Sequence, residues 1–241
     1  MTSANGTLGS AFMTAVTRRA RHAARRLARS DRGAVTIEFV IVVPLMLLVL
    51  LGFTELYLYM RAVSLVEHTA FTLADSIGQM SNVIDDSTDK TNANSLASIY
   101  AAAVMLASPN QLDTKGGVVI SSICDSTVNC TCKSVFNPTQ APGTPTLLWQ
   151  AKPTWQASGL TSTVTKTSPT PSNWPFWNGD SAVAVEVFYN YTPFSLTAPF
   201  WKTAPVATTI RERVYVRPRN GQVLALNNTK TGALCETAPI N

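Results

Sequence analysis

The strongest pattern in the chain is a long uncharged apolar run close to the N-terminus. From Phe39 to Phe53 no residue carries a strong polar group, and Pro44 lies inside the run. As a helix this run covers about 22 Å, less than the roughly 30 Å of a bilayer's hydrocarbon core. Extended over residues 34–60 it reaches about 40 Å and places Tyr57 and Tyr59 where interfacial aromatic residues are common. The pattern predicts a transmembrane helix at 34–60, with a local kink at Pro44.

Beyond residue 60 the apolar positions recur at helical spacing, which predicts that the helix continues over about 61–80 with one buried face. The positions of this stripe are Ala62, Leu65, Val66, Thr69, Leu73, Ile77 and Met80. An acidic loop follows, and a second apolar stripe predicts a helix at about 92–107 that ends before Pro109.

From residue 115 the period changes to two, so strands are expected mainly after this point. A strand starts near Val118, alternating valines and tyrosines mark a strand at 183–191, and a third covers 210–216. Residues 137–180 form a Pro- and Ser/Thr-rich loop with a short strand near 146–150, and a final strand is expected near 222–226. The fold class is therefore α+β, with a long N-terminal transmembrane helix, a short helix and an antiparallel sheet.

Charge is concentrated at one end of the chain. The formal net charge is +5, but residues 1–33 contain seven arginines and one acid, so the remainder is close to neutral. Positive residues before an apolar helix predict a cytoplasmic N-terminus. The chain then divides into a basic cytoplasmic leader at 1–33, a transmembrane helix at 34–60 and an exported α+β domain at 61–241. An organellar transit peptide is the alternative for the arginine-rich leader.

The junction between leader and helix carries a specific motif, Arg32-Gly33-Ala34-Val35-Thr36-Ile37-Glu38-Phe39. It resembles the processing site of type IV prepilins, in which a membrane peptidase cuts after the glycine and the fifth mature residue is glutamate. The resemblance implies a processing site at Gly33 and Ala34. A glycine also suits close approach of an extended backbone to a protease.

The segment from residue 33 onward looks like the TadE-like proteins of tight-adherence (Tad/Flp) pili. The shared positions are Gly33, Glu38, Phe39, Gly52 and Glu55, and residues 183–194 and 211–219 resemble the strand segments that end such proteins. The resemblance implies a minor pilin or pseudopilin in the bacterial inner membrane, pilus-associated after processing. Its implied partners are a prepilin peptidase, other pilins and pilus-assembly subunits, and the lipid bilayer.

Glu38 and Phe39 are the candidate residues for subunit pairing and assembly. A carboxylate costs about 2.5–3.5 kcal/mol at the centre of a bilayer and less near its surface, so Glu38 needs a partner. Cleavage would create an ammonium on Ala34, one helical turn away in the same chain, and the two groups could also pair between neighbouring subunits. The simpler alternative places Glu38 in the headgroup region, where its charge suits the N-terminus of the helix.

The four cysteines all fall in the region expected to be exported, where two disulfides are favoured and three pairings are possible. They are Cys124, Cys130, Cys132 and Cys235. A bond between Cys130 and Cys132 is the least favoured, and one of the first three is expected to reach Cys235. A four-cysteine zinc site is the alternative, but its spacing is irregular.

The remaining polar and aromatic candidates have ordinary explanations that we prefer. His68 is expected to be a surface or packing residue, and the acids at 85, 86 and 89 a solvated loop that caps the next helix rather than a calcium site. The tryptophans are expected to fill a loop-rich core rather than contact carbohydrate or another subunit. The arginines at 211–219 are expected to form a solvated strand face rather than contact an acidic partner or nucleic acid.

No phosphate loop, dinucleotide-binding glycine pattern or nucleophile motif is present, so we expect neither an enzyme, nor a cofactor, nor nucleic-acid binding. Two classes of function remain. One is the processed pilin or pseudopilin. The other is an unprocessed single-pass envelope protein whose exported domain binds a partner.

Overall fold

The computed structural model describes residues 31–128, 139–194, 207–219 and 223–227. The chain divides into two compact units, Met1–Leu56 and Tyr57–Asn241, and each is described by itself. The leader residues 1–30 lie outside the described part of the chain.

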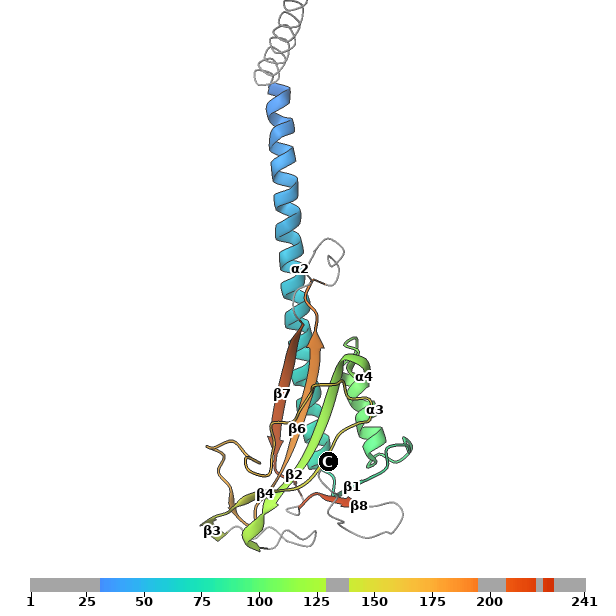
Figure 1. Cartoon of the computed structure of the whole chain (residues 1–241), viewed down its shortest axis with the longest axis vertical. Coiled ribbons are helices and arrows are strands. Elements are labelled where there is room, and N and C mark those ends of the chain that lie inside the picture. Colours follow the sequence, from blue (N-terminus) through green and yellow to red (C-terminus); the bar gives the residue numbers. More distant parts are fainter. Residues whose placement is uncertain (1–30, 129–138, 195–206, 220–222, 228–241) are drawn as a thin grey trace, which may run out of the picture. The chain divides into compact units, whose positions relative to one another are not determined.

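The described part of the first unit is a single helical segment, the beginning of α2 (Asp31–Gly78) (Figure 1). The helix runs unbroken past Pro44, and the Thr54 hydroxyl donates a 2.8 Å hydrogen bond to the carbonyl of Leu50 within it. Neither Pro44 nor Gly52 ends the helix, which continues to Gly78.

The second unit is built on a four-stranded antiparallel sheet with the strand order β4-β2-β6-β7. Its strands are β2 (Gly116–Asp125), β4 (Pro145–Ala151), β6 (Ser181–Tyr191) and β7 (Thr208–Val216). In register, Val118 lies opposite Val187 and Val185 lies opposite Val214, so β-branched side chains from neighbouring strands gather on one face.

Among the described residues, the second unit also contains two small sheets, three short helical elements and the part of α2 beyond Leu56. Strand β3 (Thr139–Pro142) pairs with β5 (Trp177–Asn178), and β1 (Asn82–Ile84) pairs in parallel with β8 (Ala225–Asn227). The helical elements are α3 (Leu96–Leu106), α4 (Leu112–Lys115) and the 3-10 turn η1 (Ser126–Val128).

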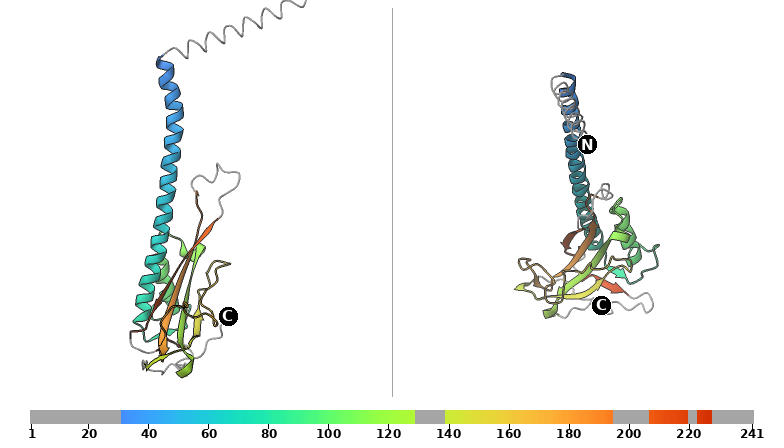
Figure 2. Two further views of the ribbon diagram at one scale, coloured as in Figure 1. Left: turned by 90° about the vertical axis from the view of Figure 1, so that its left-hand side faces the viewer. Right: turned by 45° about the horizontal axis from the view of Figure 1, so that its top comes forward.

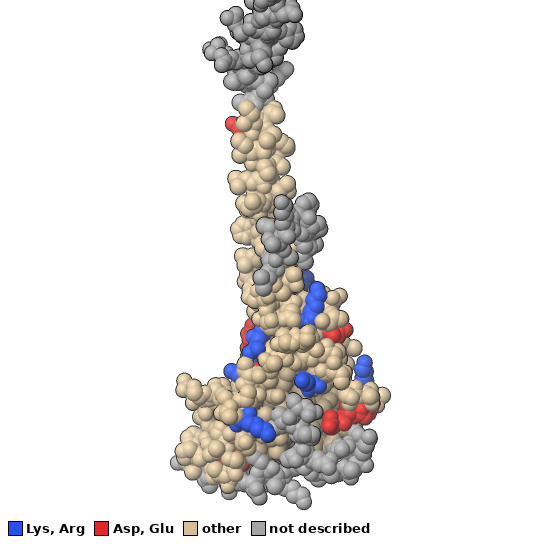
Figure 3. Space-filling view, in the orientation of Figure 1, with Lys and Arg blue, Asp and Glu red and all other residues tan. Residues whose placement is uncertain are grey.

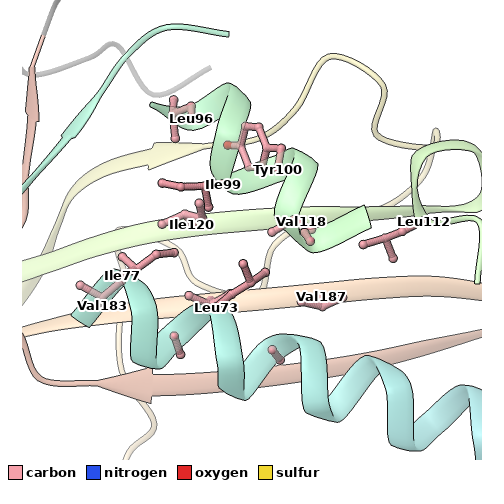
Figure 4. Close-up of a cluster of buried hydrophobic side chains, with 14 of the residues drawn as sticks. Leu73, Ile77, Leu96, Ile99, Tyr100, Leu112, Val118, Ile120, Val183 and Val187 are labelled. Atoms are coloured by element: carbon pink, nitrogen blue, oxygen red, sulfur yellow. The ribbon is translucent and has the colours of Figure 1, made fainter. Parts of the chain in front are cut away.

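One face of the main sheet is covered by helices, and the largest core of the described residues lies between the two layers (Figure 4). The end of α2 contributes Val66, Leu73 and Ile77, and α3 contributes Ile99 and Tyr100, all at most 5% exposed. The predicted stripe is thus confirmed at its centre, because spacings of three and four residues place these side chains on one side of the helix.

The other face of the sheet is covered by residues 152–180, which contain little regular secondary structure (Figure 2). Val164 and Phe176 are buried there against Ile123, Ala182 and Ala184. The loop-like character predicted for this region is confirmed, but its role as the second layer of the domain is a property of the three-dimensional structure.

The α+β class is confirmed, and several local details differ from expectation. Helix α3 begins at Leu96, not near residue 92, because Ser95 caps it by accepting a hydrogen bond from the Ser98 backbone N–H. Helix α4 was not expected, and the last strand is β8, at residues 225–227. The pairing of β1 with β8 is parallel, whereas only antiparallel pairing was expected. The two strands are far apart in the sequence, so the local pattern of residues does not predict that they pair.

The packing predicts the effect of a cavity in the core. Ile120, on β2, is fully buried in the core between the sheet and the helices, so Ile120→Ala should lower the free energy of unfolding by about 2–5 kcal/mol. Phe71→Ala, at a side chain that is 53% exposed on α2, should change it by less than about 0.5 kcal/mol. Urea unfolding of the detergent-solubilised chain, followed by tryptophan fluorescence, measures both; equal effects would contradict this account of the core.

Candidate membrane and assembly site

The most unusual surface of the first unit is the apolar surface of α2, because apolar side chains surround the helix on all sides. Large apolar side chains between Ile37 and Phe53 are 44% to 69% exposed, except that of Val43, which is half-buried. In the space-filling view this stretch is almost free of charged residues (Figure 3). An uncovered apolar surface of this kind marks contact with a membrane or with other chains.

The described residues contain one helix long and apolar enough to cross a bilayer, at Thr36–Gly78. Its most apolar 18-residue window has a mean hydropathy of 2.6, and none of that window is buried within the structure. The long apolar helix fits a single-pass membrane protein.

Glu38 and Phe39 lie side by side in sequence near the start of this surface, and both side chains are exposed. Within the described residues, Glu38 takes part in neither of the two salt bridges, which join Arg217 to Asp180 and Arg219 to Asp75. The Glu38 carboxylate is exposed in the part of the chain that the structure describes. Its role in pairing stays a prediction.

The expected processing junction, Gly33–Ala34, lies within the helical segment α2. A peptidase that binds an extended backbone at this bond would need the helix to open locally. Glycine is a poor helix former, which lowers the cost of such opening.

The second unit contains three buried carboxylates that the sequence argument did not single out: Asp125, Asp180 and Glu186, each at most 2% exposed. Glu186 offered a visible signal, because it interrupts the apolar run Val183-Ala-Val-Glu-Val-Phe of strand β6. Asp125 ends β2 and Asp180 directly precedes β6, and both resemble ordinary turn residues in sequence.

Asp125 joins three loops at the end of β2. Its carboxylate accepts hydrogen bonds from the backbone N–H groups of Thr127 (3.0 Å), Thr144 (2.9 Å) and Gly179 (2.7 Å), and from the Thr127 hydroxyl (2.7 Å). Gly179 has a φ of 75°, a conformation that glycine adopts without strain. Burial alone raises the pKa of Asp125, but these hydrogen bonds outweigh it and hold the pKa below its ordinary value of 3.8.

Glu186 and Asp180 tie residues 152–180 to the sheet. Glu186 accepts hydrogen bonds from the Ser162 hydroxyl and from the backbone N–H of Thr163 (3.1 Å). Asp180 forms a two-pronged ion pair with Arg217, whose Nε and terminal nitrogen lie 3.0 and 2.9 Å from the same carboxylate oxygen. Paired or hydrogen-bonded burial is what makes such charged groups tolerable in a protein interior.

The arginines at 211–219 have partners inside the domain. Arg211 donates to the Thr161 carbonyl at 3.4 Å, and Arg213 donates to the Thr163 hydroxyl at 2.7 Å. Arg217 and Arg219 pair with Asp180 and Asp75. The arginine side chains predicted to form a solvated strand face therefore also contact residues 152–180 and α2.

The acidic loop that contains Asp86 and Asp89 is held by hydrogen bonds among its own residues. Asp86 accepts from the backbone N–H groups of Thr88 (2.7 Å) and Asp89 (3.0 Å), and Asp89 accepts from that of Thr91 (2.8 Å). Hydrogen bonds with the neighbouring threonines lower the pKa of both carboxyl groups. Among the described residues no group of three potential metal ligands is present. The loop also helps to cap α3, as expected: the Asp86 carbonyl accepts a 2.9 Å hydrogen bond from the Ala97 backbone N–H, while Ser95 supplies the capping side chain.

The described tryptophans divide between the core and the surface. Trp149 is 1% exposed and donates a 2.8 Å hydrogen bond to the Leu224 carbonyl, while Trp155 and Trp174 are half-buried. Trp177 is 40% exposed. Trp201 lies outside the described residues.

The cysteine prediction falls largely outside the described residues, because Cys130, Cys132 and Cys235 are not among them. Cys124 is buried at the end of β2 and does not carry a free thiol. The pairing stays a prediction. His68 is exposed on α2, in agreement with the surface position expected for it.

These features define a protein with one helix suited to a membrane and an α+β domain. The family model for TadE-like proteins matches residues 33–75, which confirms the resemblance drawn from the motif and is consistent with a TadE-like protein of the Tad pilus system. Comparisons with curated proteins and with solved structures find no match to this chain.

The lowered pKa of Asp125 predicts a specific dependence on acid. Its stabilising effect is fully present above the ordinary value of 3.8 and is lost as the pH falls through the lower folded-state value. Asp125→Asn should lower the free energy of unfolding by about 1–3 kcal/mol at pH 7, since an amide faces donors that the carboxylate accepted. It should also flatten the pH dependence below pH 5, roughly the upper end of carboxyl titration.

Urea unfolding over a series of pH values tests this prediction. Asp113→Asn, at an exposed carboxylate on α4, is the matched control and should leave both quantities unchanged. An unchanged acid dependence in Asp125→Asn would contradict the assigned role.

Proposed function

We propose that the protein is a minor pilin or pseudopilin that acts in assembly of a Tad/Flp-type pilus. We further propose that a prepilin peptidase cuts it between Gly33 and Ala34. The observation that carries the proposal is the coincidence of the TadE-like match at 33–75 with a helix whose apolar surface is uncovered on all sides. A bilayer covers such a surface before assembly, and other subunits cover it afterwards.

The charges around the helix support one orientation. Seven arginines precede residue 33, whereas Arg61 is the first basic residue after the apolar run. This asymmetry favours a cytoplasmic leader and an exported second unit in the bacterial inner membrane. In that arrangement the peptidase would meet the Gly33–Ala34 bond at the cytoplasmic surface.

Glu38 supplies a reason for ordered assembly. An exposed carboxylate at the edge of an apolar helix is costly to transfer into a filament core unless a cation meets it. The new ammonium of Ala34 in a neighbouring subunit is such a cation, and the pair would set the axial register. Phe39, which is 67% exposed, would pack against the same neighbour.

A second candidate function has an observation in its favour. The unit Tyr57–Asn241 has its own buried core, with helices on one face of the sheet and a loop layer on the other. A domain of this kind could act as the partner-binding part of an envelope protein that is never cleaved. Both candidates are roles in binding and assembly rather than in catalysis.

Processing is tested by the N-terminus of the protein isolated from its native host. We expect mass spectrometry to find a mature chain that begins at Ala34. Gly33→Leu should abolish cleavage, since a bulky side chain would block close approach of the peptidase. Gly52→Leu is the matched control, because a Cβ at Gly52 meets no atom within 4 Å, and it should be processed normally. A wild-type protein that keeps its leader at steady state would contradict processing and favour the envelope protein.

The assembly role of Glu38 is tested separately from cleavage. Glu38→Gln keeps the shape of the side chain and removes its charge, so processing should be intact while assembled pili decrease at least about tenfold, the effect of about 1.4 kcal/mol. Glu67→Gln, at an exposed glutamate on the same helix, should affect neither. Electron microscopy of pili and immunoblots of processing provide the two measurements. Normal piliation in Glu38→Gln would contradict the pairing role.

A further inference from the structure

A groove on the second unit is not explained by membrane insertion or processing. It lies between α3 and residues 150–155, where the chain leaves β4, and has a volume of about 720 Å³. That volume falls within the range of about 300–1,000 Å³ typical of small-molecule sites. Trp155 and Tyr100 line it together with four charged residues, Asp85, Lys90, Asp113 and Lys152.

Two aromatic rings form the apolar part of the groove. Tyr100, which projects from α3 in Figure 4, meets Trp155 edge-to-face with ring centroids 6.4 Å apart. Tyr100 is only 5% exposed, whereas Trp155 is half-buried. The contact fixes the indole, so Trp155 offers a rigid apolar surface to a ligand.

The hydroxyl of Tyr100 is unusual because it is buried and has no hydrogen-bond partner among the described residues. Burial raises the pKa of Tyr100, and the negative charge of Asp85 raises it further. The phenol is therefore a neutral donor near a carboxylate, without a direct hydrogen bond between them. The phenol oxygen itself is enclosed, so the polar group that the groove offers at this end is the exposed carboxylate of Asp85, to which a ligand hydroxyl can donate.

The charges along the groove select the kind of ligand. Two lysines and two aspartates line it, and all four are exposed, so their formal charges cancel. A ligand with a net charge would be attracted by one pair and repelled by the other, so its charge gains little. A neutral ligand with many hydroxyl groups can accept from the ammonium groups and donate to the carboxylates at once.

We propose that this groove binds a neutral saccharide, with the apolar face of a sugar ring on Trp155 and a sugar hydroxyl that donates to the carboxylate of Asp85. The lysines at 90 and 152 donate to further hydroxyl groups. The site adds a binding activity to the domain and is independent of whether the leader is cleaved.

Isothermal titration calorimetry on the full chain tests the site, in a detergent without a sugar headgroup. Maltotriose and N,N′-diacetylchitobiose are the probes, and we expect saturable binding of at least one. Asp85→Asn should weaken it about tenfold, the loss of one good hydrogen bond to a charged group. Trp155→Ala should remove binding, and Trp155→Phe, which keeps an aromatic surface, should retain part of it.

Matched controls separate binding from folding. Trp177→Ala removes an exposed tryptophan outside the groove and should bind like the wild type. Asp85 is exposed, so Asp85→Asn should unfold at the wild-type urea concentration. The proposal is overturned if neither probe binds the folded wild type, or if Asp85→Asn and Trp155→Phe bind as tightly as it does. If an extended, strand-forming peptide binds the groove and neither sugar does, the proposal is also overturned.

Discussion

One helix has to satisfy two different surroundings, and the rest of the structure follows from this constraint. In the first unit the apolar side chains of α2 point in every direction and stay exposed. Beyond Tyr57 one stripe of side chains along α2 is buried, and this stripe packs on the sheet. A stripe can be covered by a single sheet face, but an all-round apolar surface needs lipid or several neighbouring helices.

The helices on one face of the sheet pack through apolar side chains, whereas the loop layer on the other face makes many polar contacts. Residues 152–180 bury few large apolar side chains, so hydrogen bonds and ion pairs carry much of their attachment. Asp125, Asp180 and Glu186 each lie where a backbone N–H or an arginine can reach the carboxylate. A buried charge is costly when unpaired, so each of these contacts specifies one position of the loop. The same stretch of residues includes Trp155, which lines the groove beside α3.

Much of the architecture could be predicted from the chain because it follows local periodicity. The valines of β6 alternate, the stripe on α2 keeps helical spacing, and both patterns appear in the structure as expected. The parallel pairing of β1 with β8 could not be predicted in this way, because it joins residues 82–84 to 225–227 through no local signal. For the same reason, proximity of Tyr100, Asp85 and Trp155 in one groove is invisible in sequence.

The sequence by itself determined the apolar helix, the motif around Gly33 and Glu38, and the α+β class, since each depends on neighbouring residues or a short repeat. Only the tertiary structure decided which carboxylates are buried and what meets them. Glu186 and Asp85 are both acids in the chain, yet the first lies beneath a loop and the second lines an open groove. Burial depends on which distant segments pack together, and that is a property of the whole fold.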